Sequence, residues 1–144
     1  MRIANVDGLV TLFYDGSELY DKDLYYEWIE EKRRKKGNEQ DMQVSPACRD
    51  FVYERWSWQQ VIVLDGVKEI PIRTFLSCKN IKRVIFSDSV ICIKSCAFMY
   101  CRSLAYIKWS INLKIIRESA FAACNLYSVF LPRSCKMLRS RAFV

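Results

Sequence analysis

Apolar residues recur along the second half of the chain at a fixed spacing of more than twenty residues. Four successive lines of sequence align when each begins at an apolar residue, and these lines start at Val61, Val84, Ile107 and Val129. The spacing between starts is 23, 23 and then 22 residues, because one residue is missing after Cys124. Internal repeats of this length are typical of solenoid proteins, in which similar coils stack on one another.

Matched apolar positions run through all four lines. Two residues after the starts lie Val63, Phe86, Trp109 and Leu131, and later in the lines come Ile70, Ile93, Ile116 and Leu138. Each line then reaches an aromatic anchor, and these anchors are Phe75, Phe98, Phe121 and Phe143. The alternation at the start of each line predicts a short strand with one face inward. We therefore expect a repeat solenoid of short parallel strands joined by loops or short helical turns, with equivalent side chains stacked in ladders.

The stretch SCAFMYCRSLAYIKW, which begins at Ser95, resembles the BspA-type leucine-rich repeats. Their pattern runs Ala-Phe-x-x-Cys-x-x-Leu-x-x-Ile-x-Ile-Pro, and in this chain the proline after the strand is present only as Pro132. The resemblance covers residues 58–144 and implies four repeats, the last incomplete. It also implies a curved leucine-rich-repeat solenoid that presents a surface of parallel strands to protein partners.

Residues 1–57 lack the repeat and are expected to form an N-terminal hairpin-plus-helix cap on the first coil. Asp7-Gly8 and Asp15-Gly16 flank the apolar run LVTLFY, which predicts a small β-ribbon. Residues 21–37 combine acidic capping residues, an apolar stripe and a basic end, and this pattern predicts a helix. A polar loop follows, and residues 48–58 then lead into the first coil as a second helix or as extended chain.

Side chains that alternate with the inward positions point outward and form the candidate partner-binding surface. The first outward column contains Ile62, Ile85, Lys108 and Phe130, and the next contains Leu64, Ser87, Ser110 and Pro132. The residues that flank these columns are Arg83, Tyr106 and Tyr127. The first column is more apolar than a solvated surface needs, so either a protein partner or the N-terminal segment covers it. We favour the protein partner.

The composition argues against an enzyme. The chain contains no histidine, which excludes Ser-His-Asp and Cys-His arrangements and removes the side chain that most often shuttles protons near neutral pH. No other constellation of residues suggests a catalytic site, and none suggests a cofactor.

The seven cysteines are expected to be reduced thiols. Cys92, Cys96 and Cys101 have C-x3-C-x4-C spacing, which differs from that of zinc sites and redox pairs, so no metal site is predicted. Cys101 has counterparts 23 residues away at Cys78 and Cys124 and is interpreted as a buried repeat position. Cys96 has no such counterpart and is interpreted as incidental.

Charge is distributed unevenly along the chain. Residues 1–60 contain 9 Lys/Arg against 12 Asp/Glu, whereas residues 61–144 contain 14 against 4. The basic repeats suggest an alternative function, a nucleic-acid-associated protein, although no recognised nucleic-acid motif is present. The basic run at 32–36 resembles a nuclear-localisation patch, but we interpret it as the solvated end of the predicted helix because no aromatic residues interleave with it.

Neither a membrane span nor a secretory signal is evident. No apolar run approaches the ~20 residues that span a bilayer, and Asp7 interrupts the short apolar stretch at the N-terminus. We therefore expect an intracellular protein, cytoplasmic or nuclear. The last line stops just after Phe143, so we expect either that the chain is a fragment of a longer repeat array or that its uncapped coil is open to self-association.

Overall fold

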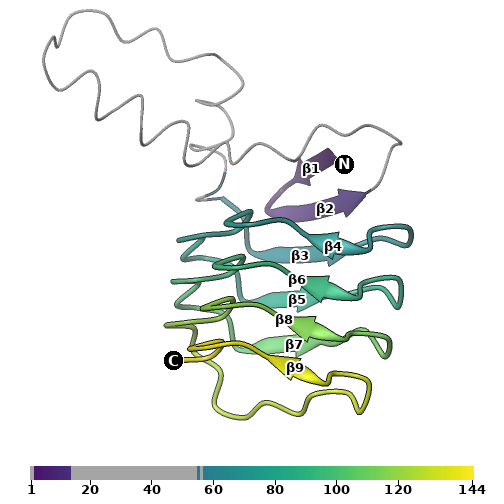
Figure 1. Ribbon diagram of the computed structural model, residues 1–144. Helices are drawn as coiled ribbons and strands as arrows, with labels where there is room; N and C mark the ends of the chain where they lie inside the picture. The colour runs from purple at the N-terminus through teal and green to yellow at the C-terminus, as the bar shows by residue number, and fades with distance from the viewer. Residues whose placement is uncertain (1, 14–54, 56) are drawn as a thin grey trace, which may run out of the picture.

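The computed structural model describes residues 2–13, 55 and 57–144, and the repeats form a stack of similar coils (Figure 1). The predicted helix, the second Asp-Gly pair, the polar loop and most of the predicted entry segment lie outside the described residues. Successive coils lie side by side, so each coil contacts its neighbours and contributes to one continuous core. The predicted repeat solenoid is confirmed.

Sheet A contains five strands in the order β1-β2-β3-β5-β7. Its strands are β1 (Arg2–Val6), β2 (Leu9–Phe13), β3 (Gln60–Val63), β5 (Arg83–Ile85) and β7 (Tyr106–Lys108). The β1-β2 pair is an antiparallel hairpin, and the other neighbouring pairs are parallel. Val61 pairs with Val84, and Val84 pairs with Ile107. The 23-residue sequence period is therefore also the register of the parallel strands.

Sheet B lies on another side of the coils and contains four short parallel strands in the order β4-β6-β8-β9 (Figure 1). These strands are β4 (Glu69–Ile70), β6 (Cys92–Ile93), β8 (Ile115–Ile116) and β9 (Met137–Leu138). Ile70 pairs with Ile93, and Ile93 pairs with Ile116. All three side chains are fully buried, which confirms the inward ladder predicted at these positions.

The centre of the core is a column of aromatic rings. Phe75, Phe98, Phe121 and Phe143 stack in sequence order, with ring centroids 4.8, 5.1 and 5.5 Å apart. Trp109 meets the edge of this column, with its ring centroid 5.3 Å from that of Phe121. Such pairs contribute roughly 0.5–1.5 kcal/mol each beyond the burial of their apolar area.

The backbone around each phenylalanine ties neighbouring coils together. The amide of Phe75 donates to the Ala97 carbonyl, and the amide of Phe98 donates to the Ala120 carbonyl, both at 2.7 Å. Residues two positions before or after a phenylalanine adopt left-handed backbone angles, with φ between 52 and 62°. These residues are Arg73, Ser77, Cys96, Tyr100, Ser119, Ala123 and Arg141. Since a left-handed conformation costs a non-glycine residue roughly 1–2 kcal/mol, the inter-coil hydrogen bonds and buried rings must offset it.

The N-terminal hairpin extends sheet A by placing β2 beside β3. It turns at Asp7-Gly8, as predicted, and Gly8 has a φ of +83°. A Cβ atom at Gly8 would lie 2.7 Å from the carbonyl oxygen of Ser57, so this close approach also favours glycine. Val10 pairs with Val61, and both side chains are fully buried. The hairpin therefore covers the core beside the first strand of the repeats.

The fourth coil differs from the prediction in sheet A. The alternating pattern predicts a strand over residues 129–131, but no strand forms there and the chain passes below β7 as a loop (Figure 1). The residue missing after Cys124 shortens this connection, whereas β9 still pairs with β8. The shortening therefore disrupts sheet A and leaves sheet B in register. Leu138 is 52% exposed, while its fully buried counterpart Ile116 has a coil on either side.

Candidate functional site

The outward face of sheet A brings together most of the predicted partner-binding residues. Ile62 lies opposite Ile85, and Ile85 lies opposite Lys108, in one column across three strands. The two isoleucines are half-buried and the lysine is exposed. Beside this column, the Arg83 guanidinium carbon lies 4.9 Å from the centre of the Tyr106 ring, in a cation–π contact. The face therefore combines apolar area, an aromatic ring and positive charge.

Two predicted residues lie outside this column. Tyr127 and Phe130 belong to the loop of the fourth coil and are 89% and 84% exposed. Because that coil has no strand in sheet A, strand pairing does not align them with Lys108.

One residue of the second predicted column points elsewhere. Ser110 was expected to lie outward, but it is fully buried. Its hydroxyl oxygen accepts a hydrogen bond from the Asn112 amide at 3.2 Å, and its carbonyl accepts one from the Leu113 amide at 3.2 Å. The chain turns at this point, so the strand alternation that assigned Ser110 to the outside no longer applies.

Sheet B presents a basic surface that the sequence interpretation did not single out. The segments 68–73, 91–96, 114–119 and 136–141 contain eight Lys/Arg and two Glu. The basic residues are Lys68, Arg73, Lys94, Lys114, Arg117, Lys136, Arg139 and Arg141. The signal in the sequence is the position directly after Ile93, Ile116 and Leu138, the last residues of β6, β8 and β9, which is always Lys or Arg.

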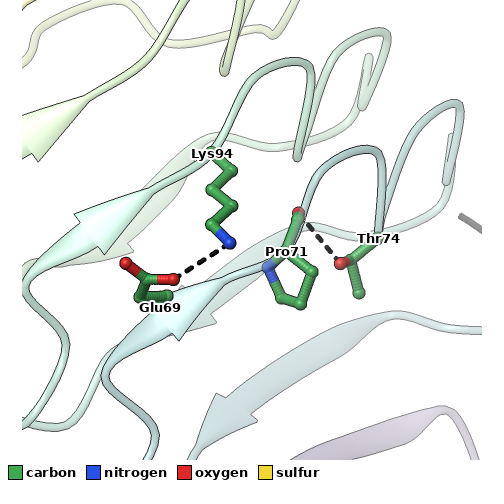
Figure 2. Close-up of polar contacts among 4 residues, drawn as sticks. All are labelled: Glu69, Pro71, Thr74 and Lys94. Carbon is green, nitrogen blue, oxygen red and sulfur yellow. Dashed lines mark hydrogen bonds and ion pairs between the residues drawn. The ribbon is translucent and has the colours of Figure 1, made fainter. Parts of the chain in front are cut away.

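One ion pair crosses this basic surface between neighbouring coils. The Lys94 ammonium lies 3.0 Å from the Glu69 carboxylate, one coil earlier (Figure 2). Both side chains are partly exposed, so the pair contributes at most about 1 kcal/mol. Its main consequence is that it neutralises one of the basic residues of sheet B.

The repeat cysteines form a column of thiols in which Cys78 and Cys101 are buried and Cys124 is partly buried. The thiol of Cys101 donates to the Phe75 carbonyl, and the thiol of Cys124 donates to the Phe98 carbonyl, both at 3.1 Å. Burial raises the pKa of the Cys101 thiol well above its usual value, so the thiol stays protonated and keeps its hydrogen bond. The interpretation of Cys101 as a buried repeat position is confirmed. The described residues contain no group of three or more potential metal ligands.

Arg55 occupies the repeat position that holds cysteine in later coils, since it precedes Cys78 by 23 residues. The side chain is buried, and its Nε donates to the Cys78 sulfur at 3.2 Å. Its Nη2 also donates to the Leu76 carbonyl. Arg55 therefore ends the thiol column at the N-terminal side, a role that apolar periodicity alone could not indicate.

Cys96 occupies a different kind of position. Its φ is +56°, and the equivalent residues in the other coils, Arg73, Ser119 and Arg141, share this left-handed conformation. The fold constrains the backbone here and accepts varied side chains. The thiol of Cys96 is therefore not part of the cysteine column.

Raising the pH above 9 is expected to destabilise the fold through Cys124. Burial raises the pKa of its thiol from the usual value near 9 to about 12. The unfolded chain releases this proton above pH 9, while the folded chain retains it up to about pH 12. The contribution of this thiol to the free energy of unfolding is therefore fully present below pH 9 and is lost as the pH rises to 12. The slope is at most about 1.4 kcal/mol per pH unit. Urea unfolding between pH 7 and 11 should show a shallower decline for Cys124→Ala than for the wild type, and identical declines would contradict this expectation.

A hollow of about 580 Å³ lies where the hairpin turn meets the first two coils. Its lining residues include Asp7, Gln59, Asn80 and Lys82. Asn5 and Ser57 also line it, and their side chains form a hydrogen bond of 3.2 Å. This bond joins the hairpin to the chain that enters β3.

Among the residues that the structure describes, none belongs to a helix with the length and apolar character needed to cross a bilayer.

The coil geometry agrees with the comparisons with known proteins. A crystal structure of a leucine-rich repeat protein from Eubacterium ventriosum is similar with a TM-score of 0.56 and 25% identity, over 61% of this chain and 24% of that chain. A leucine-rich repeat protein from T. pallidum aligns with a TM-score of 0.49 and 28% identity, over 58% of this chain and 53% of that one. This chain thus spans about a quarter of the first protein and about half of the second. No curated protein matches the chain. A family model described as the BspA type leucine rich repeat region (6 copies) matches residues 48–144, and the chain therefore belongs to the BspA-type leucine-rich repeat family.

Proposed function

We propose that the chain is a non-enzymatic protein-interaction module that binds a protein partner through the outward face of sheet A. Leucine-rich-repeat solenoids generally serve as interaction modules, and stacked coils produce an extended surface for this purpose. The site consists of Ile62, Ile85, Lys108, Arg83 and Tyr106, with Tyr127 and Phe130 on the adjoining loop as additional contacts.

The contact between Arg83 and Tyr106 is the observation that carries this proposal. The Tyr106 ring is 49% exposed and lies beside the guanidinium group of an exposed arginine. Tyrosine and arginine are among the side chains most enriched at the energetic centres of protein interfaces, because each combines large contact area with directed polar groups. The half-buried Ile85 adds apolar area directly beside this pair.

The double variant Arg83→Ala/Tyr106→Ala is expected to lose its partner. Truncation of two central interface residues should reduce the amount of captured protein by about tenfold or more. The measurement is affinity capture on the immobilised full chain, followed by quantitative comparison of each retained protein between variants.

The chain offers a matched control for this experiment. Tyr100 and Arg102 are also exposed, but they follow Phe98 in the turn and lie outside sheet A. Tyr100→Ala/Arg102→Ala should therefore retain the same proteins as the wild type. If both double variants lost the same proteins equally, or neither lost any, the assignment of the interface to sheet A would be wrong.

Nucleic-acid binding is a second candidate function, favoured by the basic surface of sheet B. The same immobilised chain would then retain polynucleotides, and their affinity would fall steeply with salt because the binding of lysines and arginines to phosphates releases counterions.

Self-association through the fourth coil also stays a prediction, supported by the exposed Leu138 and Met137. Light scattering of the purified chain tests it directly.

A further inference from the structure

Two arginines line a hollow of about 310 Å³ on the sheet B side of the molecule. Arg117 and Arg139 directly follow Ile116 and Leu138, the last residues of β8 and β9, and both arginines are exposed in neighbouring coils. Their backbone amides donate to carbonyls of the preceding coil, Arg117 to Ile93 at 2.9 Å and Arg139 to Ile116 at 3.0 Å. These hydrogen bonds hold both backbones in the stack, where neighbouring coils are spaced about 4.8 Å apart. The two arginine side chains therefore extend from backbone positions that are fixed relative to each other.

The later coils lack the carboxylate that would pair with each of these arginines. In the first two coils, Lys94 reaches back diagonally to Glu69 in β4 (Figure 2). The residues that replace Glu69 in the next two coils are Cys92 and Ile115. Neither Arg117 nor Arg139 forms an ion pair within the described part of the chain. At this repeat position the second coil has Lys94, which is ion-paired with Glu69. The third and fourth coils have Arg117 and Arg139, and neither has such a partner.

The rest of the hollow supplies hydroxyl groups and one acid. Ser95 and Ser140 line it together with Glu118. Serine hydroxyls are hydrogen-bond donors, and two arginines present fork-shaped pairs of N–H donors suited to the oxygens of a tetrahedral anion. Glu118 is the one lining residue that opposes an anion, and its carboxylate leaves the five lining residues with a net charge of +1.

We propose that this hollow binds a phosphoryl group, either inorganic phosphate or a phosphomonoester, between the guanidinium groups of Arg117 and Arg139. Phosphate suits the site better than a carboxylate because it offers enough oxygens for both arginine forks and a serine hydroxyl at once. The site is separate from the candidate interface on sheet A and does not depend on it.

Isothermal titration calorimetry of the full chain with inorganic phosphate tests the proposal, and O-phospho-L-serine is the second probe. Saturable phosphate binding is expected in the wild type, with affinity reduced about tenfold or more in Arg117→Gln/Arg139→Gln, which loses two charge-assisted donors. Glu118→Gln should bind several times more tightly, since it removes a like charge. Binding of O-phospho-L-serine would show that the source includes phosphorylated side chains, and its failure to bind would restrict the site to free phosphate.

Lys114→Gln/Lys136→Gln is the matched control, because it removes the same charge from the residues directly before β8 and β9, which do not line the hollow. This variant should keep its phosphate affinity within about twofold, as expected for residues outside the hollow. Amide NMR shifts of the wild-type chain give a readout that does not depend on any variant folding, and the largest changes should be at Ser95 and Ser140. Absence of saturation, equal losses in the two double variants, or shift changes spread over the basic surface would overturn the proposal.

Discussion

Replacing Phe98 with alanine is expected to lower the free energy of unfolding by about 3–5 kcal/mol. The Phe98 ring is fully buried and stacks on Phe75 at 4.8 Å and on Phe121 at 5.1 Å. Its removal would open a cavity in the middle of the aromatic column and break both stacking contacts at once. Coils of a solenoid are stabilised mainly by their neighbours, so the loss should affect the coils on both sides.

Urea unfolding followed by circular dichroism measures this effect. Phe130→Ala is the control, because the same change is made at a ring that is 84% exposed. Its stability should stay within about 0.5 kcal/mol of the wild type, as is usual for surface substitutions. Similar unfolding midpoints for the two variants would show that the aromatic column does not hold the coils together.

Replacing Arg55 with alanine is expected to destabilise the fold by about 3 kcal/mol. The guanidinium group is buried and donates to the Cys78 sulfur at 3.2 Å and to the Leu76 carbonyl. Alanine would leave this carbonyl without a charged donor and would uncover the thiol at the end of the cysteine column. The reaction of Cys78 with a thiol reagent under native conditions should therefore accelerate as the stability falls.

Arg83→Ala is the matched control for this experiment. Arg83 is exposed and contacts the Tyr106 ring on the protein surface, so its loss should destabilise the fold by about 1 kcal/mol or less. Its effect on the reactivity of Cys78 should be negligible. If the two arginine variants unfolded at the same urea concentration, Arg55 would not be a structural end to the thiol column.

The inward ladders could be predicted from the sequence because they depend only on which residue types recur. Each coil must bury the same positions against its neighbours, so Phe98, Ile93 and Cys101 were identifiable from their counterparts one period away. The hairpin turn was equally clear, since Asp7-Gly8 supplies the positive φ that such a turn requires. Both inferences use local or strictly periodic information.

Other features depend on backbone geometry that periodicity does not encode. Ser110 is buried because the chain turns after β7, which ends the strand alternation sooner than the apolar pattern suggests. Arg55 contributes to the core through hydrogen bonds from its guanidinium group, and the pattern of recurring apolar residues therefore gives no sign of its role. The hollow beside Arg117 is formed by residues of three coils, and none of them is unusual in a single line of sequence.

The 22-residue spacing of the last coil shows which wall of the solenoid tolerates a change in length. The stack between Phe121 and Phe143 and the pairing of β8 with β9 persist across it, whereas sheet A ends at β7. Insertions and deletions between the repeat cysteine and the next strand should therefore alter the outward face while leaving the aromatic column intact. In related arrays, the outward face would then vary in length and shape while the stability of the stacked coils is retained.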